Sequence, residues 1–151
     1  MRKLTVSFVA LIFAFFTFTG CVSSTYQNGT YRAEVVDYDS LGYKDYLVVE
    51  IQEGAVIRIE FDAVDAQGQL RSADEGYREE MEAQQSTYPA RYAADLIIQY
   101  MEVQDISKVD SVAGATYSSQ TFTTLFTALQ ENMLAGDTAT VVVNPNASRS
   151  H

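Results

Sequence analysis

The sequence has one cysteine, one histidine and no tryptophan among its 151 residues. The cysteine is Cys21, directly after an apolar N-terminal run, and the histidine is His151, in a tail where order is usually low. One cysteine cannot form a disulfide within the chain. The chain also lacks the residues that usually form a zinc site or a Ser-His-Asp triad. Redox chemistry would therefore need a cofactor that binds without Cys or His ligands.

Positive charge is also scarce, with 10 Lys and Arg against 20 Asp and Glu and a net charge of −10. Two of the cations, Arg2 and Lys3, precede the apolar run, so removal of residues 1–20 would change the net charge to −12. Such a charge repels nucleic-acid phosphates and anionic lipids. We therefore expect no nucleic-acid partner, and no membrane contact through a basic surface.

The N-terminus has the features of an export signal rather than of a folded element. Residues 4–18 carry no charge, but this run is shorter than the ~20 apolar residues that a spanning helix needs. Residues 18–21 (FTGC) resemble a bacterial lipobox, which implies cleavage after Gly20 and diacylation of Cys21 with fatty acids such as palmitate. The alternative is an uncleaved signal anchor. Both would export the domain and hold it at a membrane.

The chain divides into four parts. A lipoprotein signal peptide occupies residues 1–20, a lipidated tether residues 21–28, one folded domain residues 29–143, and a tail residues 144–151. An apolar content of 47% and a length of 151 residues fit one globular domain with a substantial core.

Strands are predicted mainly in the first half of the domain. Residues 29–36 alternate with period two, which favours a strand. Two β-rich runs, 46–52 and 55–62, flank Glu53-Gly54 and predict a hairpin. A last strand is expected over residues 138–143.

Helices are predicted in the second half. Residues 74–84 favour a short helix, and Pro89 is suited to the first position of the next one. Residues 103–112 are expected to be irregular or a short strand. Residues 120–135 have helical apolar spacing and end before Gly136. The order predicts an α+β fold, a small antiparallel sheet with helices packed on it in a single domain.

Residues 110–119 (DSVAGATYSS) form the most unusual stretch, a turn of small residues that opens the best predicted helix. Gly114 and Ala115 would let the backbone approach a ligand closely. Unpaired N–H groups and the helix dipole make such a turn an anion site.

Hydroxyl residues surround that turn. Ser118 or Ser119 is predicted to cap the helix, and Thr116 is expected one or two residues before it, with its hydroxyl in the anion site. A serine cap before an amphipathic helix is common, so a purely structural role is the alternative on the local pattern alone.

Residues 110–118 resemble the flavinylation motif of the FMN-binding domain family. That family includes the flavin subunits of the Rnf and sodium-translocating NADH:quinone reductase complexes, and small extracellular flavoproteins. The positions that match its pattern are Asp110, Gly114, Ala115, Thr116 and Ser118. Ala113 departs from the pattern, because the family usually has a hydroxyl residue there.

The resemblance covers nearly all of residues 26–143 and is closest to small, membrane-anchored FMN-binding lipoproteins. Residues 28–31 (NGTY) look like the opening of those domains. Similar stretches follow at residues 37–62, 87–89 and 136–138.

The resemblance implies that a magnesium-dependent FAD:protein FMN transferase attaches FMN to Thr116 through a phosphoester. Thr116 would then be an acceptor and not a catalytic residue. Asp110 would be read by the transferase or would position the loop. Gly114 and Ala115 would give the phosphate room, and Ser118 would cap the helix and bond a phosphate oxygen.

Three tyrosines are candidates for contact with the flavin ring: Tyr117, Tyr88 and Tyr43. With 10 tyrosines in the chain, a core or rim position is the favoured alternative for each.

No metal site is predicted. The run Glu79, Glu80 and Glu82 does not converge on one point of a helix, and the aspartates of residues 37–45 lack the spacing of a calcium-binding EF-hand loop.

The resemblance therefore implies an exported electron carrier, lipid-anchored on the cell-surface or periplasmic side, with an unknown donor and acceptor. The alternative is a non-redox surface lipoprotein, a binding or antigenic module that keeps the fold without flavin; Ala113 favours it. A free-standing flavin reductase ranks last, because the sequence supplies no acid, base or nicotinamide site.

Overall fold

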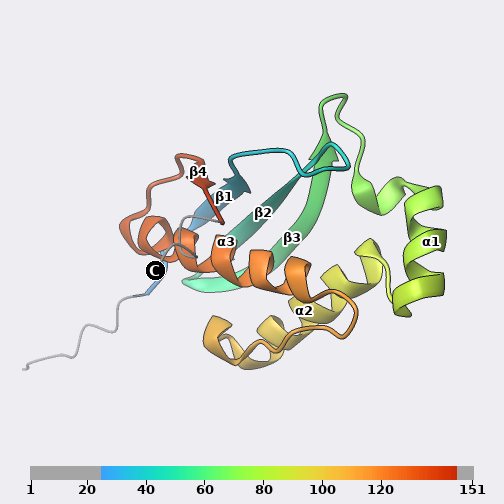
Figure 1. Ribbon diagram of the computed structural model, residues 1–151. Coiled ribbons are helices and arrows are strands. Elements are labelled where there is room, and N and C mark those ends of the chain that lie inside the picture. Colours follow the sequence, from blue (N-terminus) through green and yellow to red (C-terminus); the bar gives the residue numbers. More distant parts are fainter. Residues whose placement is uncertain (1–24, 146–151) are drawn as a thin grey trace, which may run out of the picture.

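The structure, a computed structural model, describes residues 25–145. Its four strands are β1 (Gly29–Val35), β2 (Tyr43–Gln52), β3 (Ala55–Asp65) and β4 (Val141–Val143). They form one sheet in the order β3-β2-β1-β4 (Figure 1). The first three are antiparallel neighbours, whereas β4 pairs in parallel with β1. The sheet is therefore mixed, because the chain returns through a helix to its β1 edge.

Three helices accompany the sheet: α1 (Glu75–Gln85), α2 (Pro89–Val103) and α3 (Thr116–Ala135). Short 3₁₀ turns lie at Arg71–Ala73 (η1) and Ile106–Lys108 (η2). Helices α2 and α3 cover one face of the sheet, and α1 lies beyond the end where η1 begins (Figure 1). This confirms the predicted α+β single domain.

The predicted hairpin is present between β2 and β3. Its turn residues have φ values of 53° at Glu53 and 77° at Gly54. Two left-handed residues are what a two-residue hairpin turn matched to strand twist requires. Both strands run further than predicted, because β2 starts at Tyr43 and β3 ends at Asp65. The last strand is shorter, at three residues.

The core lies between the sheet and helices α2 and α3. Phe122 and Phe126 of α3 are fully buried, and the Phe122 ring meets Phe61 of β3 edge-on at a centroid distance of 5.3 Å. Tyr100 of α2 packs 4.3 Å from Phe126. The predicted apolar stripe of α3 is therefore core.

Within residues 25–145, no helix is both long and apolar enough to cross a membrane. The predicted lipidation site Cys21, the signal peptide and His151 lie outside the described residues.

Candidate functional site

A pocket of about 670 Å³ opens beside the first turn of α3. Helix α1, the η1 turn and the loop between β1 and β2 form its other walls. Five of the six residues predicted to bind the cofactor line it: Gly114, Ala115, Thr116, Tyr117 and Ser118. The volume is within the range of small-molecule and cofactor sites.

The first turn of α3 differs from the prediction. The helix begins at Thr116 and not at residue 120, and Ala115 occupies the N-cap position without a side-chain cap. The predicted cap by Ser118 or Ser119 is therefore wrong. Both serines are buried within the helix.

The two serine hydroxyls are used elsewhere. Ser119 Oγ accepts a hydrogen bond from the Val112 N–H at 3.0 Å and donates one to the Ala115 carbonyl at 2.8 Å. The buried Ser118 hydroxyl faces Tyr92 of α2 and offsets part of the rise that burial causes in the Tyr92 pKa. Since no side chain caps α3, its first N–H groups keep their capacity to bind an anion.

Gly114 brings the turn close to the end of α1. Its φ is 78°, and a Cβ on it would lie 2.5 Å from the Gln85 carbonyl oxygen. This glycine therefore lets the turn before α3 pack closely against the backbone of α1. The contact holds these two lining segments of the pocket together. Ala115 is buried in the core behind the turn.

Thr116 and Tyr117 are exposed at the mouth of the pocket. Within residues 25–145, no group forms a hydrogen bond with the Thr116 hydroxyl. The Tyr117 side chain is 48% exposed. A hydroxyl that is accessible and unpaired at a helix N-terminus is suited to modification by another protein.

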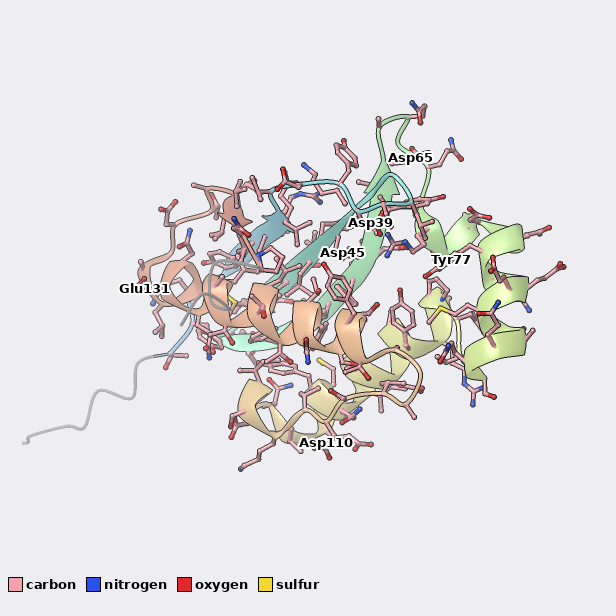
Figure 2. All side chains as sticks on the ribbon, in the orientation of Figure 1. Asp39, Asp45, Asp65, Tyr77, Asp110 and Glu131 are labelled. Carbon is pink, nitrogen blue, oxygen red and sulfur yellow. The ribbon has the colours of Figure 1, made fainter. Side chains whose placement is uncertain are left out.

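Asp110 is the one residue of these six that does not line the pocket. Figure 2 places it in the loop beside α2, well apart from the pocket residue Tyr77. Its backbone is held by Gln99 of α2, whose Oε1 accepts from the Asp110 N–H at 2.9 Å and whose Nε2 donates to the Asp110 carbonyl at 3.3 Å. The Asp110 carboxylate is exposed.

Arg71, which the sequence analysis missed, is the only cation among the described residues that line the pocket. It is 4% exposed and pairs with two carboxylates, Asp39 through Nη2 and Asp45 through Nη1 at 3.4 Å. Figure 2 shows both aspartates near the end of the sheet. These partners lie 32 and 26 residues away in the sequence, so only the fold brings them together.

Burial raises the pKa of the Asp45 carboxyl to about 6. Arg71 opposes this rise, and the nearby charges of Asp39 and Asp62 add to it. Asp45 shares the inward face of β2 with Leu47, which explains why a charged side chain is almost fully buried there.

The three candidate tyrosines are separated. Tyr117 lines the pocket, Tyr88 lies under the Arg78 guanidinium, and Tyr43 lies under that of Arg71. Tyr77 of α1, which was not a candidate, lines the pocket instead.

The loop aspartates do not gather into a metal site. Asp39 and Asp45 are engaged by Arg71, and no group of three potential ligands occurs among residues 25–145.

Comparison with known proteins shows a clear relative. The chain is 33% identical over 122 residues to the "15 kDa lipoprotein" of Treponema pallidum (strain Nichols), which covers 81% of this chain and 86% of that protein. No protein-family model matches. The resemblance to FMN-binding domains thus stays a prediction.

Among solved structures, the crystal structure of the CPE2226 protein from Clostridium perfringens is similar. The TM-score is 0.74 at 26% identity, over 79% of this chain and 98% of that chain. The agreement over nearly all of that chain supports the single-domain fold. The identity and coverage of the treponemal relative show that this chain belongs to the family of the 15 kDa lipoprotein.

Proposed function

We propose that this chain is a lipid-anchored flavoprotein that carries FMN on Thr116 and transfers electrons at the membrane surface. The observation that carries the proposal is the position of Thr116. Its unpaired hydroxyl stands at the first position of α3, at the mouth of the pocket.

The residues present fit such a group. A phosphate on Thr116 would meet the uncapped N–H groups of α3 and the positive end of a 20-residue helix. The pocket beside it, at about 670 Å³, has room for a flat ring system. Arg71 lines the same pocket and keeps a buried Nε–H without a partner.

A bound flavin would accept and release one or two electrons. The chain's own residues would bind and orient it. The N-terminus of α3 holds the phosphate end, while Tyr77 and Tyr117 offer aromatic surface. Covalent attachment would keep the group on an exported protein.

The lipid anchor is supported by the relative's name, and Cys21 is the residue proposed to carry it. The chain enters the domain at the C-terminal end of α3, where the Gln27 N–H donates to the Met133 carbonyl at 2.7 Å. Thr116 is at the other end, about 30 Å away for a 20-residue helix. The pocket would thus open away from the anchored end.

Intact-mass spectrometry tests the attachment. The protein is expressed and exported with an active FAD:protein FMN transferase, and a gain of one FMN phosphoester is expected. Thr116→Ala should abolish the gain. Thr127→Ala, the same change at an exposed position of α3, should keep it.

An unmodified mass, with the transferase active on another substrate, would exclude covalent flavin. The non-redox surface lipoprotein would then be the working model. Loss of fatty-acid labelling in Cys21→Ser tests the anchor separately.

A further inference from the structure

The Arg71 guanidinium is a buried cation whose charge is already balanced within the protein. Nη2 pairs with Asp39 and Nη1 with Asp45, and the side chain is 4% exposed. Two carboxylates against one guanidinium leave the cluster with a net negative charge when both are ionised.

Aromatic rings hold the guanidinium in place. Its central carbon lies 4.8 Å from the Tyr43 ring centroid and 5.7 Å from that of Tyr77. The Tyr43 hydroxyl is in turn fixed by a hydrogen bond to Asp74 Oδ2 at 3.1 Å. The side chain is therefore preorganised, which reduces the entropy lost when it binds a ligand.

One nitrogen of this group has no partner among the described residues. Arg71 Nε is buried and has no hydrogen-bond partner within residues 25–145, although Arg71 lines the pocket. Leaving a buried N–H unpaired is unfavourable, so a ligand that accepts a hydrogen bond from it relieves that cost. Such an unsatisfied donor beside a pocket indicates a missing acceptor.

The charge of the cluster selects the kind of acceptor. Because Asp39 and Asp45 already balance Arg71, and Glu80 adds another carboxylate to the lining, a dianionic phosphate gains little here. An uncharged carbonyl oxygen or ring nitrogen avoids this repulsion. The apolar surfaces of Tyr77 and Met81, which also line the pocket, suit a flat ring.

We propose that Arg71 donates its Nε–H to the carbonyl edge of a flat heteroaromatic ring that lies in this pocket. The inference rests on the proposed function, in which that ring is the flavin. It divides the site into two parts: the α3 N-terminus takes the phosphate, and the Arg71 cluster takes the ring.

The test uses the protein produced without the transferase, and riboflavin as the probe. Riboflavin has no phosphate and cannot be joined to Thr116, so the result is independent of covalent attachment. Quenching of riboflavin fluorescence gives its Kd. On the wild-type protein, ¹⁵N NMR follows the Arg71 Nε–H resonance, which burial protects from solvent exchange.

We expect riboflavin to bind and to shift the Arg71 Nε–H resonance, while inorganic phosphate at the same concentration leaves it in place. Arg71→Lys keeps the positive charge but loses this donor, and should raise the riboflavin Kd about tenfold. Arg78→Lys is the matched control on α1. The Arg78 guanidinium lies over Tyr88, and Arg78 does not line the pocket. The riboflavin Kd of this variant should therefore equal that of the wild type.

Any of the following results on the wild type would overturn the proposal: no riboflavin binding, an unmoved resonance on binding, or a phosphate-induced shift as large as that from riboflavin. An equal Kd in folded Arg71→Lys would do the same. If that variant does not fold, the wild-type resonance decides alone.

Discussion

Gly114 packs against Gln85 so closely that a Cβ on Gly114 would lie 2.5 Å from the Gln85 carbonyl oxygen. The contact joins the turn before α3 to the last residue of α1. Both segments line the pocket beside Thr116, and they meet at this contact. The width of the site therefore depends on a position where only glycine fits.

Gly114→Ala should destabilise the domain for two reasons, a left-handed φ of 78° and a backbone clash. Gly68→Ala is the matched control, because φ is 83° there and a Cβ would meet nothing within 4 Å. We expect the control to cost about 1–2 kcal/mol from φ alone. Gly114→Ala should cost about 1–3 kcal/mol more. Urea unfolding measures both, and equal costs would show that the approach to Gln85 is not tight.

Ser119→Ala should loosen the turn that presents Thr116. The change removes the bond to the Ala115 carbonyl and leaves the partly buried Val112 N–H without an acceptor. The expected loss is about 1–3 kcal/mol, with faster hydrogen exchange at the Val112 amide. Thr123→Ala removes only a hydroxyl that bonds back to the Ser119 carbonyl within α3. That control should leave Val112 exchange unchanged; if it accelerates exchange equally, the turn is not held by Ser119.

The sequence predicted the elements that local periodicity specifies. The hairpin at Glu53-Gly54 and the apolar stripe from Phe122 to Met133 are both present. The start of α3 was missed because its first turns bury hydroxyl residues, which give no apolar period: Ser118, Ser119 and Thr121.

Arg71 could not be found from local pattern. Its partners Asp39 and Asp45 come from the β1–β2 loop and from β2, and a lone arginine in a polar segment gives no sign that it will be buried. Its position was open to prediction only once β2 and η1 were known to be adjacent. The motif of residues 110–118, by contrast, pointed to five residues that line the pocket.

Asp45 should make stability depend on pH in the acid range. Its pKa of about 6 is above the ordinary aspartate value of 3.8, so the folded state binds a proton more tightly than the unfolded state. The resulting stabilisation is fully present below pH 3.8 and is lost as pH rises through about 6.

The free energy of unfolding of the wild type, relative to Asp45→Asn, should therefore fall by about 1–3 kcal/mol between pH 4 and pH 7. Urea titrations across this range measure the difference. Asp37→Asn, a change at an exposed carboxylate of the neighbouring loop, is the control variant. A rising difference for Asp45 would mean that pairing with Arg71 outweighs burial.

Variants at Asp110 and its neighbour Gln99 separate two possible roles of Asp110, recognition by a transferase and support of the loop. Its carboxylate is exposed, and no residue within 25–145 bonds to it, while its backbone is held by Gln99. Asp110→Ala should therefore change the free energy of unfolding by less than about 0.5 kcal/mol. If the transferase reads this carboxylate, the rate of FMN attachment to Thr116 should nevertheless fall at least about tenfold, as timed mass spectrometry would show.

Gln99→Ala is the complementary variant, because it frees the Asp110 backbone but keeps the carboxylate. Slow attachment in Gln99→Ala with normal attachment in Asp110→Ala would assign the role to loop position instead.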